Sequence, residues 1–242
     1  MQSIGGVSLR TAGARNAKAA MNRVRQAQAE SRAPVDRIVR HAGLDRSIHW
    51  LAAASVLTLL FTAFLPILGI EFAWVTIHWV AGLVLIAIVV VHVVRAVVWQ
   101  DRRSMWFDRR DLRDAVAILQ RTWRMGGEPP GRPGKYSFAQ KLIHLAFTVV
   151  VLAAAVTGAL MMVKIDTPWW QRNPYWLSDG QWGVVYVVHG LAALCLVTMV
   201  MAHVYFALRP EKLHFTRSMI LGWITRAEYR AEHDPNRWQV DR

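Results

Sequence analysis

The chain has 242 residues, 54% of them hydrophobic, and it carries a formal net charge of +13. A soluble domain rarely combines these features, and since no stretch interleaves basic with aromatic residues, the charge does not indicate a nucleic-acid-binding protein. The single cysteine, Cys195, excludes an internal disulfide, a cysteine-based zinc site and an iron–sulfur cluster held by this chain alone.

Residues 1–47 come before the first apolar block and contain no apolar core of the kind that a signal peptide needs. Residues 9–33 are rich in Arg and Ala and poor in acids, which weakly resembles a transit peptide. The composition favours a flexible, basic tail, and we expect 1–47 to be an N-terminal cytoplasmic tail.

Four apolar blocks follow, at about 48–68, 75–99, 139–163 and 183–208. Each block is long enough to cross a hydrocarbon core about 30 Å thick at 1.5 Å per residue, and in lipid the backbone must satisfy its own hydrogen bonds. The sequence therefore predicts an all-α fold, a four-transmembrane-helix bundle over 48–208. In the tail 209–242 we expect one short amphipathic helix over 216–231 on the inner surface, with His214 and His233 as surface residues.

The basic residues predict the orientation of the bundle. Most of the 29 Lys and Arg residues lie in 1–47, in 99–138 and from Arg209 onward, whereas the two opposite loops carry only Lys164 and Arg172. Because positive residues stay in the cytoplasm, both termini are predicted to be cytoplasmic. The Trp-rich loop 167–182 then faces outward, where it is a plausible docking surface for a partner subunit or simply an interfacial loop.

Two histidine pairs with the same spacing lie in the second and fourth blocks, His78 with His92 and His189 with His203. Fourteen residues make nearly four helical turns, so both members of a pair project from one face, about 21 Å apart. Since alternate spans run in the same direction, His78 and His189 share one depth near the outer surface. This pattern predicts two haem b groups, each held by histidines of two helices. The alternative is a haem-free proton or ion carrier that uses the same histidines.

The inner level has four candidate imidazoles rather than two, because His49 begins the first block and His144 lies early in the third. Spacing alone would select His92 with His203 as the inner haem ligands. Arg95, just beyond His92, is a candidate partner for a haem propionate, and it is otherwise an interface anchor together with Arg102 and Arg103.

Several motifs resemble the cytochrome b (gamma) subunit of membrane-bound formate dehydrogenases, a diheme family similar to cytochrome b561. The resemblance spans about 36–240 and rests on four stretches: "DRSIHW" at 45–50, "HWVAGLVLIAIVVVHVVR" at 78–95, "GKYSFAQK" at 134–141 and "SMILGWITRAEYRAEHDPNRW" at 218–238. The first two match the entry to helix one and the whole of helix two in that family. The last two are more specific, because other diheme cytochromes share only the helix pattern.

The resemblance implies a set of site residues. It assigns the outer haem to His78 and His189 and the inner haem to His49 and His203, with His92 as the alternative inner ligand. It also implies a quinone site beside His203. The residues of that site are Ser137, Ala139 and Gln140, where Ser137 and Ala139 replace an Asn and a Gly of the family pattern.

The resemblance also implies a function. As a membrane anchor in the bacterial inner membrane, the chain would pass electrons from the periplasmic iron–sulfur beta subunit of formate dehydrogenase to menaquinone or ubiquinone at the cytoplasmic side. A bis-histidine haem has no open position and so passes electrons, and formate itself would react at the molybdenum- or tungsten-containing alpha subunit. The cytochrome b subunit of a nickel–iron hydrogenase, or of another quinone-linked reductase, is the alternative.

Overall fold

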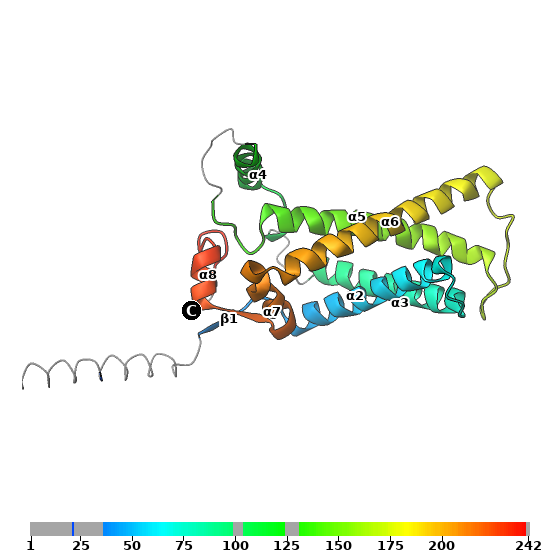
Figure 1. The fold of residues 1–242 in the computed structure, drawn as a ribbon, viewed down its shortest axis with the longest axis horizontal. Helices are drawn as coiled ribbons and strands as arrows, with labels where there is room; N and C mark the ends of the chain where they lie inside the picture. The colour runs from blue at the N-terminus through cyan, green and yellow to red at the C-terminus, as the bar shows by residue number, and fades with distance from the viewer. Residues whose placement is uncertain (1–20, 22–35, 99–103, 124–130, 241–242) are drawn as a thin grey trace, which may run out of the picture. The chain divides into compact units, whose positions relative to one another are not determined.

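The computed structural model describes residues 21, 36–98, 104–123 and 131–240. Four long helices lie side by side in it: α2 (Gly43–Phe64), α3 (Trp74–Val98), α5 (Phe138–Met161) and α6 (Asp179–Leu208) (Figure 1). All four are long and apolar enough to cross a membrane, and only 6–17% of the most apolar window of each is buried inside the protein. An apolar surface left so open fits a lipid environment. The prediction of an all-α bundle with four membrane spans is confirmed.

Packing in the bundle is strongest within consecutive pairs of spans. Helix α2 packs along α3 and α5 along α6, while α3 also contacts α5. The first connection is short: η1 (Pro66–Leu68) follows α2, and Gly69 turns the chain with a φ of 83°. In the last connection η3 (Met162–Lys164) ends α5, and the Ser178 side chain caps α6 together with Gln181.

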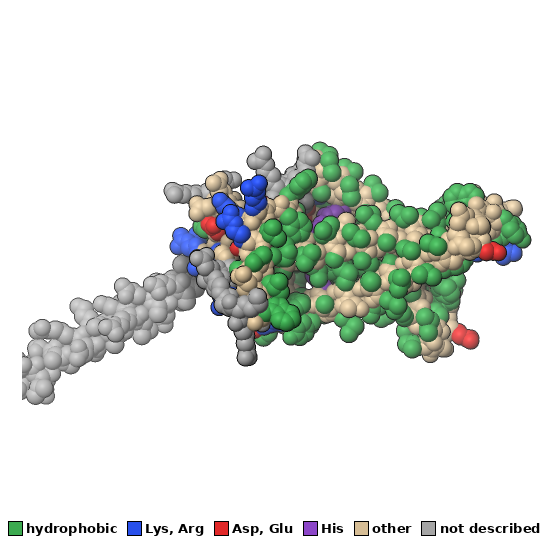
Figure 2. All heavy atoms as spheres, turned by 90° about the horizontal axis from the view of Figure 1, so that it is seen from above, with side chains coloured by type: hydrophobic (Ala, Val, Ile, Leu, Met, Phe, Trp, Pro, Cys, Tyr) green, Lys and Arg blue, Asp and Glu red, His purple; other side chains and the backbone are tan. Residues whose placement is uncertain are grey.

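Lys and Arg side chains gather at one end of the bundle, beside its apolar surface (Figure 2). We call this end, where α2 and α5 begin and α3 and α6 finish, the basic end; the opposite end carries the Trp-rich loop 167–182. That the basic end faces the cytoplasm stays a prediction, as does the division into 1–47, 48–208 and 209–242. Most of the predicted N-terminal tail lies outside the described residues.

A helix that sequence analysis did not predict, α4 (Arg109–Thr122), lies between the second and third spans. It begins with a capping box in which Asp108 accepts from the backbone of Asp111 and Asp111 accepts in return. Asp111 is 1% exposed, and it forms ion pairs with Lys141 of α5 at 2.7 Å and with Arg237 at 3.2 Å. These contacts join α4 to the membrane domain and to the C-terminal tail.

The C-terminal tail holds several short elements rather than the single amphipathic helix predicted for 216–231. After η4 (Pro210–Lys212) come α7 (Leu213–Leu221), β2 (Trp223–Thr225) and α8 (Arg226–Glu232). The break falls at Gly222, whose φ of 92° is strained for other residues and whose added Cβ would lie 3.0 Å from the His41 carbonyl. Strand β2 pairs with β1 (Arg37–Val39), so segments far apart in the sequence form a two-stranded sheet.

Candidate functional site

At the level nearer the Trp-rich end, the imidazoles of His78 (α3) and His189 (α6) face each other with ring centroids 6.3 Å apart. A metal-bound imidazole nitrogen lies about 2 Å from its metal, so two imidazoles on opposite sides of one metal ion have centroids about 6 Å apart. The observed spacing therefore suits a pair of axial ligands.

Threonine side chains orient both of these imidazoles. Thr62 Oγ1 donates its only proton to the backbone of its own helix, at 2.8 Å from the Thr58 carbonyl oxygen. Its remaining contact, 2.8 Å to His78 Nδ1, must therefore be accepted from an Nδ1–H. Thr157 repeats the arrangement, donating to the Ala153 carbonyl at 2.6 Å and accepting from His189 Nδ1 at 2.9 Å. With Nδ1–H used in this way, Nε2 is the ring nitrogen left to bind a metal in the neutral form of each imidazole.

A glycine makes room for the ring on α6. A Cβ added to Gly158 of α5 would lie 3.2 Å from His189 Cε1, which is tighter than an ordinary contact. Neither this glycine nor the two threonines was singled out from the sequence. The one available signal was a threonine or glycine inside an otherwise apolar span, which is too common to identify a site by itself.

Four histidines lie at the level nearer the basic end, as expected, and they form two facing pairs. His49 of α2 faces His203 of α6 with ring centroids 6.2 Å apart, and His92 of α3 faces His144 of α5 at 5.9 Å. The pairing of His92 with His203, which spacing alone favoured, is not formed: among the described residues no ring contact joins them. The residues that the resemblance implied, His49 and His203, do face each other. Their role as ligands stays a prediction.

The residues expected at the quinone site serve as a helix cap. The Ser137 backbone N–H donates to Gln140 Oε1 at 2.9 Å, and the Gln140 backbone N–H donates to Ser137 Oγ at 3.3 Å. This capping box begins α5, and its S-x-x-Q signature was visible in the sequence. Ala139 lies exposed beside it. Nothing in this geometry tests quinone binding, but both polar side chains already have a hydrogen-bond partner.

Arg95 forms an ion pair with Asp45, which joins the basic ends of α3 and α2. The predicted contact with a haem propionate is untested. Arg102 and Arg103, its expected companions at the interface, lie outside the described residues.

The stretches 134–141 and 218–238, the two most specific motifs of the resemblance, contact each other at the basic end. His233 Nδ1–H donates to the Gly134 carbonyl at 2.6 Å, and Arg40 donates from Nη1 to His233 Nε2 at 2.8 Å. Arg40 also donates from Nη2 to the Lys135 carbonyl at 2.9 Å. The expectation that His233 is a surface residue is therefore wrong: it is 1% exposed, because the tail folds back onto 133–135.

Burial sets the charge state of this cluster. It lowers the pKa of His233 to about 4, and the neighbouring Arg40 adds to the effect while the bond to Gly134 opposes it. Burial also lowers the pKa of Arg40 to about 10 and that of His41 to about 4. His233 is thus neutral at neutral pH, which leaves its Nε2 free to accept from Arg40.

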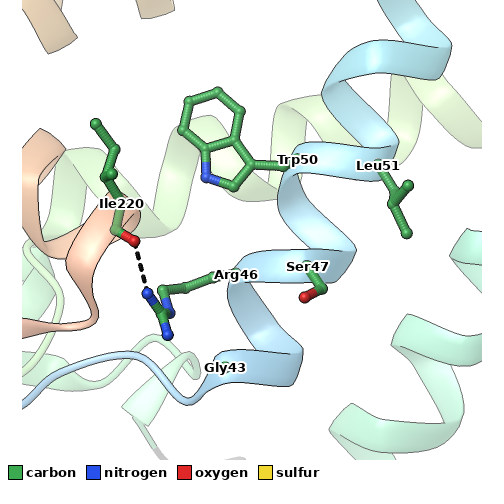
Figure 3. A pocket seen from close by; sticks show the side chains of 6 residues that line it. All are labelled: Gly43, Arg46, Ser47, Trp50, Leu51 and Ile220. Carbon is green, nitrogen blue, oxygen red and sulfur yellow. Dashed lines mark hydrogen bonds between the residues drawn. The ribbon is translucent and has the colours of Figure 1, made fainter.

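A cavity of about 600 Å³ lies between the start of α2 and the end of α7 (Figure 3). The Arg46 guanidinium crosses it and donates from Nη1 to the Ile220 carbonyl at 2.6 Å. The lining residues are Gly43, Arg46, Ser47, Trp50, Leu51 and Ile220. None of the facing histidines lines this cavity, so it is separate from the site inside the bundle.

Four apolar spans that hold facing imidazoles at two depths define a membrane-bound protein of the b-type cytochrome class. Comparison with known proteins agrees with this class. The chain belongs to the prokaryotic cytochrome b561 family, whose model matches residues 40–222. It is therefore a multi-pass inner-membrane cytochrome b that takes part in electron transfer, and the family implies that it binds haem b.

The chain is also similar to curated relatives over most of its length. It is 27% identical over 219 residues to the formate dehydrogenase cytochrome b556(fdo) subunit of Escherichia coli strain K12. The matched residues cover 84% of this chain and 92% of the relative. The proteins of the same name from Escherichia coli O6:H1 and O157:H7 match to the same extent.

Proposed function

We propose that the chain holds two haem b groups and links an iron–sulfur partner at the Trp-rich end with a quinone at the basic end. The complex would be a formate dehydrogenase, like that of the Escherichia coli relatives. The observation that carries the proposal is the facing, threonine-oriented pair His78 and His189. His49 and His203 form a second facing pair, in which His203 lies fourteen residues after His189 on α6.

The residues present fit the cofactor that the family implies. Two imidazoles that face each other at about 6 Å centroid spacing inside apolar spans would suit a haem iron bound between them. His78 and His189 would hold the haem nearer the Trp-rich end, and His49 and His203 the haem nearer the basic end. Each haem, when bound, supplies one-electron transfer.

The chain itself would hold the two haems in position and keep water away from them. The fourteen residues between His189 and His203 separate the two levels by about 21 Å along α6. The apolar spans keep water away from both levels, and the acceptors Thr62 and Thr157 raise the basicity of the imidazoles that they orient.

The Trp-rich end offers a surface for the electron donor. Trp169, Tyr175 and Trp176 are 66%, 92% and 56% exposed in the isolated chain. An aromatic belt at the membrane interface explains part of this exposure. Aromatic side chains are also enriched at protein interfaces, which supports docking of an iron–sulfur subunit here. We place the quinone at the opposite end, near His203, Gln140, Ser137 and Ala139.

A reduced-minus-oxidised spectrum of the purified chain, together with haem quantification, tests the proposal. We expect two haem b per chain, with His78→Ala and His49→Ala each losing one and His92→Ala losing none. If His92→Ala loses the haem that His49→Ala keeps, the ligand assignment at the basic end is wrong.

The identity of the complex needs a second measurement. Co-purified with its partners, the chain should show haem reduction on addition of formate, and the preparation should contain molybdenum or tungsten. Reduction by hydrogen together with bound nickel would instead identify a hydrogenase subunit.

A further inference from the structure

The facing pair of His92 and His144 is not used by the function proposed above. Both residues lie six residues from the basic ends of their helices, α3 and α5, and so does His49 in α2, while His203 lies five from the end of α6. At 1.5 Å per residue each imidazole lies about 8–9 Å along its helix from the basic end. A second pair is therefore placed beside the predicted haem ligands.

The imidazoles of this pair have unused hydrogen-bonding capacity. Among the described residues neither the His92 nor the His144 imidazole makes a hydrogen bond, unlike the imidazoles of His78 and His189 with their threonines. A direct N–H···N bond of about 2.9 Å would bring the ring centroids to about 5.2 Å. At 5.9 Å the rings are too far apart for that bond. The spacing is close to that of the predicted haem-ligand pairs, and it also admits one oxygen atom that accepts from both rings at a bent angle.

This pair lies within the membrane spans α3 and α5 and is accessible: in the isolated chain His144 is exposed and His92 half-buried. A ligand that enters here comes from the membrane, so it must be largely apolar and carry an oxygen acceptor. On α5, Phe147 packs on the predicted haem ligand His203 with ring centroids 5.9 Å apart, and His144 lies about one turn from Phe147.

We propose that His92 and His144 bind the quinone headgroup, both donating a hydrogen bond to one of its carbonyl oxygens. This rests on quinone being the electron acceptor, as proposed above. Within the quinone site proposed near His203, this assigns the hydrogen bonds to the headgroup to a pair one helical turn deeper than the start of α5. At that start Ser137 and Gln140 bond each other. Because the two imidazoles face each other, both would donate to the same one of the two carbonyl oxygens.

The test uses the full chain in lipid nanodiscs, with decylubiquinone and menaquinone-4 as separate probes. Dissociation constants are measured for the wild type, His92→Leu, His144→Leu and His144→Gln, and haem per chain is determined for each. Infrared difference spectra with the probes labelled at one carbonyl at a time report which C=O bond is weakened. His214→Gln, a histidine of the tail outside the spans, is the matched control.

For the probe that binds, we expect each Leu variant to raise the dissociation constant about tenfold, as the loss of one buried hydrogen bond does. Haem content should stay at the wild-type value. One carbonyl band should be shifted down in the wild type and the control, and the shift should weaken in both Leu variants. His144→Gln, which keeps an N–H donor, should fall between wild type and His144→Leu.

Equal binding and an unchanged carbonyl band in the Leu variants would refute this inference and leave the proposed function standing. Loss of haem in either variant would also refute it, because the residue would then be an axial ligand. If the wild type binds neither probe, both proposals fall.

Discussion

Removing the hydroxyl that orients an outer imidazole is the sharpest perturbation that the structure offers. Thr62→Val keeps the shape of the side chain but removes the oxygen that accepts from His78 Nδ1 at 2.8 Å. The Nδ1–H then loses its hydroxyl acceptor inside an apolar bundle, and the loss of such a hydrogen bond costs about 1–3 kcal/mol. Such outer-shell partners typically change metal affinity by about 10- to 100-fold. We expect a loss of that size for the haem held by His78 and His189.

The assay follows haem transfer from the detergent-solubilised protein to an excess of apomyoglobin. The wild type should release its two haems in two phases, and Thr62→Val should speed the phase that belongs to the outer level only. Thr58→Val is the matched control, because it lies one turn away on the same helix and its hydroxyl donates to the Ala54 carbonyl rather than contacting a histidine. Equal release by Thr62→Val and Thr58→Val, or faster release from both levels, would refute the reasoning.

Three further perturbations test the bundle and the cap, by which we mean α4, the β1–β2 sheet and the C-terminal tail at the basic end. Gly158→Ala should weaken the outer haem, since its Cβ must displace the imidazole of α6, whereas Gly190→Ala meets nothing within 4 Å and should bind haem normally in the same titration. Burial lowers the pKa of His233 from 6.5 to about 4. Between these two pH values the unfolded tail therefore binds more protons than the folded tail. The contribution of His233 to stability is full above pH 6.5 and falls as the pH drops toward 4. Hydrogen exchange of residues 133–136 should accelerate over that range, and less steeply in His233→Gln. Asp111→Ala leaves the buried Lys141 without its carboxylate and removes one of the two carboxylates that pair with Arg237. It should cost about 3–5 kcal/mol, measured as a lower melting temperature, while Glu211→Ala, at an exposed ion pair, should melt with the wild type.

The membrane domain could be predicted closely because lipid restricts what a segment can be. Helix α6 was expected from 183 and begins at Asp179, and α2 was expected from 48 and begins at Gly43. The differences lie at the polar ends, where capping and ion pairs rather than hydropathy decide the boundary. At the start of α6 the capping box of Ser178 and Gln181 adds a turn, and at the start of α2 the ion pair of Asp45 with Arg95 holds one.

The cap at the basic end was mostly missed. Helix α4, the β1–β2 sheet and the burial of His233 all depend on contacts between residues about a hundred positions or more apart, such as Arg40 with His233 and Asp111 with Arg237. Periodicity carries no information about such contacts. The family-like motifs at 134–141 and 218–238 marked the region, but only the fold showed that one packs on the other.

By itself the sequence determined four apolar helices and the depth of each histidine, because the helical rise converts residue number into distance along the membrane normal. It could not decide which imidazoles face each other. That depends on how each helix is rotated and which neighbour it packs against, and only the tertiary structure set His203 opposite His49 and His92 opposite His144. The threonines and the glycine behind the outer pair belong to neighbouring helices, so they too acquired their role only when the bundle formed.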